Sequence, residues 1–259
     1  MDLAEFRILT FDCYGTLIDW ETGILAALRP WLSRTGSSAS DDDVLQAYAR
    51  AESAAERAQP GALYPDILRA AVDAVAAELG HAIREDERDA FAASVGDWPA
   101  FPDSATALAD LKTRYQLAIL SNVDRASFAR TNARLGVEFD AVMTAQDIGS
   151  YKPDLANFRY MFDILTRRGI ERGQILHVAQ SLHHDIAPAR ELGLSCVWID
   201  RRRDRPGAGA TPPSDVTADV SFASLAEFAR ATAATMSQRR GLRPVLRSRA
   251  WRSRCDTTR

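Results

Sequence analysis

The sequence predicts an α/β fold: a parallel sheet with helices on both faces and a block of helices inserted after the first strand. After Pro99, short apolar segments alternate with amphipathic ones, which is typical of parallel strands joined by helices. Between Trp20 and Trp98 the chain is instead rich in Ala, Leu, Arg and Glu, with apolar residues at helical spacing. Several apolar segments end in polar residues, as expected where the carboxyl ends of parallel strands form a binding edge.

The first expected strand is the apolar segment Phe6–Phe11, which is followed by Asp12 and the turn residues Tyr14-Gly15-Thr16. Four helices are expected next, in Ile24–Leu32, Val44–Ala55, Ile67–Leu79 and Glu85–Val95. A helical block inserted directly after the first strand is expected to lie over the strand ends as a cap.

The second half of the chain alternates between the two element types. Strands are expected at Gln116–Leu120, Ala141–Thr144, Ile175–Ala179, Ser195–Ile199 and Asp219-Val220. Helices are expected at Ser104–Arg114, Arg125–Leu135, Asn157–Arg168, Asp185–Leu192 and Ser224–Ala234. We therefore assign residues 1–18 and 99–235 to the core, residues 19–98 to the cap, and residues 236–259 to an Arg-rich tail that we expect to be disordered.

Composition and charge restrict the class of protein. The chain has 259 residues, and no apolar run is long enough to span a bilayer or act as a secretory signal. Its three cysteines are widely spaced, which fits a reducing cytoplasm and argues against a disulfide framework or a zinc site. The formal net charge is −3, although residues 237–259 carry eight Arg and one Asp. The rest of the chain is therefore acidic, and neither a membrane nor nucleic acid is expected as a partner.

Asp12 is a candidate nucleophile. A carboxylate at the end of a buried strand can attack an electrophile and form an ester or acyl phosphate that water then hydrolyses. An isolated Asp at such a position is more often a solvated turn residue or a helix cap, but the polar residues at the other strand ends favour the catalytic interpretation. Thr16 can hold the carboxylate by a hydrogen bond. The ammonium of Lys152, whose backbone is restricted by Pro153, can neutralise charge that develops there.

Other strand ends carry further candidates. Ser121 and Asn122 can donate hydrogen bonds to a substrate carboxylate or phosphate, or cap the helix that follows them. Asp185 can position water or Lys152, or cap its own helix. The adjacent residues His183 and His184 are expected to point apart, so we expect no metal site built from histidine.

Four motifs, in this order, resemble those of the haloacid dehalogenase superfamily. They are Phe11-Asp12-Cys-Tyr-Gly-Thr16-Leu, Ile119-Leu120-Ser121-Asn122, Tyr151-Lys152-Pro153-Asp154 and Val178-Ala-Gln-Ser-Leu-His-His-Asp185. The resemblance covers about residues 6–200. It implies a Rossmann-like core with parallel sheet and an inserted α-helical cap.

Two positions indicate a branch of the superfamily. Its phosphatases carry Asp-x-Asp in the first motif and Gly-Asp-Ser in the fourth, where this chain has Tyr14 and Ala179-Gln180-Ser181. A neutral tyrosine is a poor proton donor near pH 7, and the loss of a carboxylate weakens magnesium binding. The chain is thus similar to the type II 2-haloacid dehalogenases, which implies catalysis without a metal or another cofactor. Mg²⁺ is expected only in the phosphatase alternative.

This resemblance implies that Asp12 displaces halide from C2 of a small carboxylic acid, and that water near Asp185 and Lys152 hydrolyses the resulting ester. Halide leaves unprotonated, so no general acid is needed. The residues expected to bind the substrate are Cys13 and Tyr14 through their backbone, Ser121, Asn122, Gln180, Ser181 and, in the cap, Arg50.

The match to proven dehalogenases is incomplete. Their fourth motif runs Ser-x-Asn-x-x-Asp, whereas Gln180 and Leu182 stand here, and Phe158 replaces an expected tyrosine. We expect a hydrolase that dehalogenates small 2-haloacids, with a magnesium-dependent phosphatase and a non-catalytic binding module as alternatives. Dimers are common in the resembling family, and the sequence leaves a homodimer open.

Overall fold

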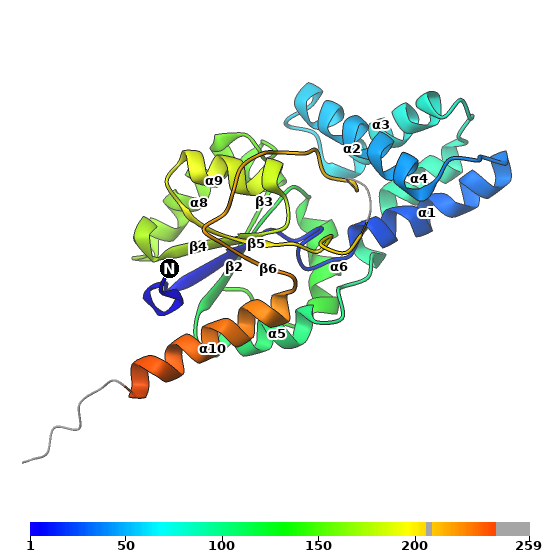
Figure 1. Ribbon diagram of the computed structural model, residues 1–259. Coiled ribbons are helices and arrows are strands. Elements are labelled where there is room, and N and C mark those ends of the chain that lie inside the picture. Colours follow the sequence, from blue (N-terminus) through cyan, green and yellow to red (C-terminus); the bar gives the residue numbers. More distant parts are fainter. Residues whose placement is uncertain (206–208, 242–259) are drawn as a thin grey trace, which may run out of the picture.

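The computed structural model describes residues 1–205 and 209–241. Its centre is a sheet of six parallel strands in the order β3-β2-β1-β4-β5-β6 (Figure 1), which confirms the predicted fold class. The strands are β1 (Ile8–Phe11), β2 (Gln116–Ser121), β3 (Ala141–Thr144), β4 (Ile175–Ala179), β5 (Ser195–Ile199) and β6 (Val220–Phe222).

Strand β1 lies between β2 and β4, and all four of its residues are buried. Its side chains alternate between the two faces of the sheet, as the period of a strand requires. Leu9 and Phe11 belong to one hydrophobic cluster, and Ile8 belongs to another. Asp12, whose amide donates to the carbonyl of Val178 at 3.2 Å, is therefore held at the middle of the carboxyl edge.

Helices cover both faces of the sheet (Figure 1). On the face of Leu9 and Phe11 lie α5 (Ser104–Lys112), α6 (Arg125–Leu135) and α10 (Leu225–Gly241). On the face of Ile8 lie α8 (Leu155–Arg167) and α9 (Ala187–Glu191). The short elements are the α7 turn (Ala145–Ile148), three 3₁₀ turns (Leu3–Glu5, Val95–Asp97 and Arg172–Gln174) and a π-helical turn (Leu182–Ile186).

Four consecutive helices form the cap: α1 (Trp20–Thr35), α2 (Asp41–Ala58), α3 (Tyr64–Glu78) and α4 (Glu85–Ala93). Figure 1 shows them beyond the end of the sheet to which β1 points. Their N-termini are stabilised locally, since Asp19 accepts from the amide of Thr22 and Ser40 and Asp43 form a reciprocal capping box at the start of α2. A helical cap over the strand ends was expected from the sequence.

The turn from β1 into the cap depends on Gly15. Its φ is +93°, a region that side chains rarely adopt. A Cβ there would also lie 3.0 Å from Oε1 of Gln180 and 3.1 Å from Nε1 of Trp20. The turn is closed by the amides of Leu17 and Ile18, which both donate to the carbonyl of Cys13. The chain can thus leave the strand sharply and keep Asp12 at the strand end.

Two boundaries differ from the predicted ones. Helix α10 runs to Gly241, so residues 236–241 are helical and not part of a disordered tail. The rest of the predicted tail, residues 242–259 with Cys255, lies outside the described residues. The helix expected to begin at Asp185 begins with a π-helical turn at Leu182. Among the described residues, no helix is long and apolar enough to cross a membrane.

Candidate active site

Lys152 joins the ends of three strands. Its Nζ donates to Oδ1 of Asp12 at 2.9 Å, to Oδ1 of Asp185 at 2.6 Å and to the carbonyl of Leu120 at 3.0 Å. Only 1% of Lys152 is exposed, and both carboxylates are buried as well. All three of its N–H donors are therefore used, and the structure brings together the three charged residues predicted to be catalytic, Asp12, Lys152 and Asp185.

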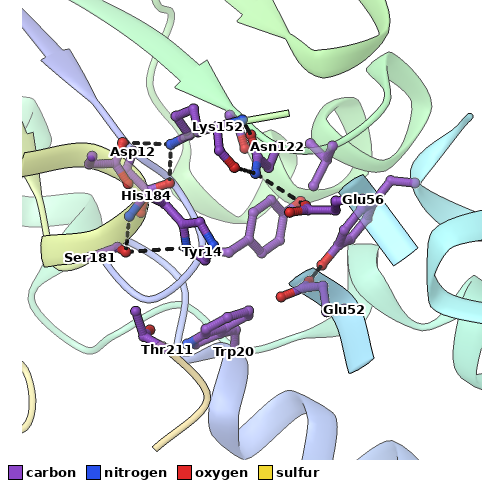
Figure 2. A pocket seen from close by; sticks show the side chains of 14 residues that line it. Asp12, Tyr14, Trp20, Glu52, Glu56, Asn122, Lys152, Ser181, His184 and Thr211 are labelled. Carbon is purple, nitrogen blue, oxygen red and sulfur yellow. Dashed lines mark hydrogen bonds and ion pairs between the residues drawn. The ribbon is translucent and has the colours of Figure 1, made fainter. Parts of the chain in front are cut away.

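The other oxygen of Asp12 is held by Thr16. Its hydroxyl donates to Oδ2 of Asp12 at 2.6 Å, and the same hydroxyl accepts from the amide of Gln180 at 2.8 Å. Thr16 is fully buried, so this hydrogen bond is shielded from water. Both oxygens of Asp12 are thus oriented by donors, which fixes the direction in which the carboxylate faces the pocket (Figure 2).

A buried histidine that was not predicted from the sequence, His177, holds the carboxylate of Asp185 in place. Nε2 of His177 lies 3.0 Å from Oδ1 of Asp185, and Nδ1 lies 2.9 Å from the hydroxyl of Thr10. Thr10 and His177 are direct cross-strand neighbours of β1 and β4. Oδ2 of Asp185 is buried and has no hydrogen-bond partner, so it can accept a hydrogen bond from water or substrate.

The electrostatics of the three charged groups are set by burial and by their mutual distances. Burial would raise the pKa of Asp185, but Lys152 and His177 outweigh it, so the pKa of Asp185 lies below its usual value. For Asp12, burial is the stronger effect and raises the pKa, with Lys152 acting against it. Burial would lower the pKa of Lys152, but the two carboxylates raise it above its usual value. Lys152 is therefore an ammonium at neutral pH.

Asn122 holds the Lys152 loop in place. Its Oδ1 accepts from the amide of Lys152 at 2.7 Å, and its Nδ2 donates to the carbonyl of Lys152 at 3.0 Å and to Oε1 of Glu56 at 3.1 Å. Asn122 is thus a clamp between core and cap. The neighbouring Ser121 is 2% exposed, and its buried hydroxyl has no partner, so it offers a free donor in the pocket.

Tyr14 and Cys13 contribute no reactive side chain. The hydroxyl of Tyr14 hydrogen-bonds to that of Thr131 at 2.7 Å, and burial raises its pKa well above the usual value. Burial likewise raises the pKa of the Cys13 thiol, which does not line the pocket. Within the part of the chain that the structure describes, the amides of both residues donate no hydrogen bond. The amide of Tyr14, a residue that lines the pocket, is therefore free to bind an anionic substrate group.

The fourth motif is arranged differently from the prediction. Gln180 does not line the pocket of Asp12, because its Oε1 accepts from Thr211 and its carbonyl accepts from Nε1 of Trp198. The structure therefore does not bring Gln180 to the position predicted for it beside the substrate. Ser181 does line the pocket and caps the π-helical turn through the amide of His184 at 2.9 Å. Burial lowers the pKa of His184 to about 3, so its imidazole is neutral.

The cap closes the pocket with acids rather than with an arginine. Glu52 and Glu56, both buried, face the pocket from α2 (Figure 2). Arg50 lies outside it: its guanidinium pairs with Glu78 on the cap surface, and both side chains are largely exposed. The predicted role of Arg50 in gripping the substrate is therefore wrong. The pocket measures about 40 Å³, which leaves room for a few water-sized groups.

A larger groove of about 460 Å³ adjoins this pocket and shares Glu56, Lys152 and His184 with it. Arg57 and His183 line the groove, so the cap arginine nearest to the site is Arg57. Burial and the charge of Arg57 both lower the pKa of His183. The groove thus lies beside the pocket that Asp12 lines.

The site does not fit a magnesium ion of the kind that the phosphatase alternative requires. Mg²⁺ prefers several oxygen ligands, with at least one or two carboxylates. Here the ammonium of Lys152 lies between Asp12 and Asp185, and the side chain of Gln180 points elsewhere. In the described ranges, no group of three or more His, Cys, Asp or Glu could hold a metal ion.

Solved structures share the fold of this chain. A defluorinating L-2-haloacid dehalogenase, Rha0230, has a TM-score of 0.72 at 21% identity, over 88% of this chain and 95% of that one. The L-2-haloacid dehalogenase from Xanthobacter autotrophicus has a TM-score of 0.70 at 20% identity, over 87% and 97% of the two chains. At these identities the likeness shows the fold alone.

One curated relative is, by its name, a phosphatase and not a dehalogenase. Glyceraldehyde 3-phosphate phosphatase from Methanocaldococcus jannaschii is 38% identical over 68 residues, which is 26% of this chain and 28% of that protein. The match thus spans less than a third of the relative's length.

The family itself is shown by a match that covers most of the chain and all four motifs up to Asp185. The model for the haloacid dehalogenase-like hydrolases matches residues 6–193, the segment that contains the helical cap and every residue that surrounds Lys152. With this match, the parallel sheet and the carboxylates at its edge, the chain belongs to the haloacid dehalogenase-like hydrolases.

Proposed function

We propose that the protein hydrolyses a small 2-haloacid to a 2-hydroxyacid through an ester of Asp12. An oxygen of Asp12 attacks C2, the new C–O bond forms as the carbon–halogen bond breaks, and halide leaves with the bonding electron pair. Water then attacks the ester carbonyl carbon. The 2-hydroxyacid departs, Asp12 regains a carboxylate with one oxygen from water, and one proton is released.

The surrounding residues have matching roles in this scheme. Lys152 and Thr16 orient Asp12, and Lys152 also keeps Asp185 ionised. The free Oδ2 of Asp185 is suited to hold the attacking water. The unpartnered hydroxyl of Ser121 and the free amide of Tyr14 are suited to the substrate carboxylate.

The observation that carries the proposal is the position of Tyr14. It stands two residues after the nucleophile, and its buried hydroxyl is committed to Thr131. The first motif therefore offers no acid to a departing alkoxide, whereas a halide leaves without a proton. Displacement at carbon suits this arrangement better than cleavage of a phosphate ester.

A phosphatase is the second candidate, and one observation favours it. The 68-residue match to glyceraldehyde 3-phosphate phosphatase is higher in identity than any of the structural likenesses described above. Two features argue against it: Gln180 stands where the phosphatases carry a carboxylate that helps bind magnesium, and the ammonium of Lys152 already contacts Asp12 and Asp185.

Halide and phosphate release distinguish the two candidates. The protein is incubated with 2-chloropropionate and with p-nitrophenyl phosphate, each with magnesium or with EDTA. We expect chloride release that EDTA does not change and that Asp12→Asn abolishes. Phosphate release that depends on magnesium, without chloride release, contradicts the proposal.

A labelling experiment tests the ester directly. In a single turnover in H₂¹⁸O with excess protein, we expect the hydroxyl oxygen of the product to come from Asp12 and to be unlabelled, while ¹⁸O appears in Asp12. Label in the first product instead means that water attacks C2 directly.

A further inference from the structure

The cap wall of the pocket contains two buried carboxylates on one face of α2. Glu52 and Glu56 are four residues apart, and they are 4% and 6% exposed. Within the described part of the chain, neither forms an ion pair. Lys152, the lysine that lines the pocket, is committed to Asp12 and Asp185. The pocket therefore has four carboxyl groups around one ammonium.

The carboxyl group of Glu52 is held through one of its two oxygens. Its Oε1 accepts from the hydroxyls of Tyr48 at 2.8 Å and Tyr64 at 2.5 Å. Two donors on the same oxygen fix the carboxyl group, and its Oε2 accepts no hydrogen bond from the described residues. Glu56 is held by a single donor, Nδ2 of Asn122, which contacts its Oε1.

Unpartnered polar atoms in the same pocket indicate that a ligand belongs there. The hydroxyl of Ser121, Nε2 of His184 and Oδ2 of Asp185 are all buried and lack a hydrogen-bond partner. Their residues are 2%, 8% and 0% exposed, and all three line the pocket. Buried polar groups without partners are rare in folded proteins, and they occur where a ligand or water completes them.

The two sides of the pocket differ in what they can bind. On the core side, the hydroxyl of Ser121 and the amide of Tyr14 offer donors to an anion. On the cap side, burial raises the pKa of Glu52 to about 7 and the pKa of Glu56 well above its usual value. These two buried acids (Figure 2) form no ion pair with the described residues, and a positively charged ligand group would supply the missing partner and favour their ionised form. A substrate that satisfies both sides carries a carboxylate at one end and a positive charge at the other.

We propose that Glu52 and Glu56 form a subsite for a primary ammonium group, and that the substrate is an amine-bearing 2-halo acid. This inference rests on the proposed function for the halogen and the carboxylate, but the ammonium subsite itself is argued only from the cap side of the pocket. Glu56 lies at the junction of the pocket and the groove, so the ammonium end lies toward the entrance. The two acids thus select the substrate and take no part in the bond changes.

Unreactive analogues of equal length test the subsite in the full chain. Binding of butyrate, 4-aminobutyrate and n-butylamine is measured by titration calorimetry. We expect 4-aminobutyrate to bind at least about tenfold more tightly than butyrate, since the ammonium gains a buried charged partner. Glu56→Gln should reduce this ratio to within about twofold, and Glu52→Gln should reduce it in the same direction.

Glu78→Gln is the matched control, because it removes the same charge from the exposed surface of the cap. It should leave the ratio as in the wild type. Equal or tighter binding of butyrate to the wild type, no binding of 4-aminobutyrate, or an unchanged ratio in both Glu52→Gln and Glu56→Gln overturns the inference. The wild-type ratio decides the matter even if a variant fails to fold.

The same titration separates this inference from the proposed function. If n-butylamine binds but butyrate does not, and 2-chloropropionate gives no chloride, the ammonium subsite stands and the haloacid proposal fails. If 2-chloropropionate is turned over but 4-aminobutyrate has no advantage over butyrate, the haloacid proposal stands and the subsite fails.

Discussion

The Nζ of Lys152 lies 2.6 Å from Oδ1 of Asp185, and Nε2 of His177 lies 3.0 Å from the same oxygen. One carboxylate oxygen thus accepts from two buried donors, while Oδ2 of Asp185 accepts from none. This arrangement keeps the free oxygen facing the pocket. It also makes the stability of the core depend on the positive charge of Lys152, which pairs with both buried carboxyl groups.

Lys152→Met should therefore reduce both stability and turnover. The variant leaves Asp12 and Asp185 buried without their cation, which costs about 3–5 kcal/mol of unfolding free energy. Chloride release from 2-chloropropionate should fall by at least about a hundredfold. Urea denaturation at pH 7 and a halide assay measure the two effects.

Lys112 provides the control, because it is the other lysine of the chain and pairs with Asp140 at the surface at 2.9 Å. Lys112→Met should cost less than about 1 kcal/mol. A similar loss of stability in both variants would mean that the buried Lys152 pairs contribute no more than a surface pair.

His177 should act on the second chemical step through Asp185. His177→Leu removes the hydrogen bond to Oδ1 of Asp185 and should slow ester hydrolysis about tenfold, while His177→Gln can retain a donor and recover part of the rate. Mass spectrometry of the quenched protein should then find the Asp12 ester accumulating. His81→Leu, a change in the cap beside Arg50, serves as the control. If ester formation slows as much as its hydrolysis, His177 does not act through Asp185 and water.

The core of the site could be predicted from the sequence because it depends on order along the chain. Strand-ending residues of parallel strands meet at one edge, so Asp12, Ser121 and Asp185 had to lie near each other once the strands were identified. His177 was missed for a physical reason. It lies inside a buried strand, and its pairing with Thr10 becomes visible only when the register of β1 and β4 is known.

The cap could not be predicted to the same depth. Its helices follow from apolar periodicity, but this pattern does not say which face meets the core. Arg50 and Glu52 are two residues apart on α2, so they are about 200° apart around the helix, and only one of them can face Asp12. Gln180 was misplaced similarly, since neighbouring residues after a strand point in opposite directions and Ser181 faces the pocket.

Arg50→Gln tests the corrected placement. Because Arg50 is exposed and pairs with the exposed Glu78, the substitution should change the KM and kcat for 2-chloropropionate by less than about twofold, and the unfolding free energy by less than about 0.5 kcal/mol. Steady-state halide release measures the first effect, and urea denaturation the second. A tenfold rise in KM would return Arg50 to the substrate site.

Glu52 should make stability depend on pH in a direction opposite to that of most acids. Burial raises its pKa from the usual 4.5 to about 7. A carboxyl group with a higher pKa in the folded chain holds its proton more tightly there, so stability is lost as the pH rises from about 4.5 to about 7. Glutamine cannot ionise. Glu52→Gln should therefore be about 2–3 kcal/mol more stable than the wild type at pH 8 and nearly equal to it at pH 4.

Urea denaturation of both proteins at pH 4 and pH 8 measures this difference, with the exposed Glu78→Gln as the control that should change little at either pH. An advantage of Glu52→Gln that is equal at the two pH values would mean that Glu52 does not ionise in the folded protein. The expected result has a functional side. Ionised Glu52 destabilises the cap at neutral pH and faces the reactive pocket. Its presence there is therefore explained by ligand binding and not by folding.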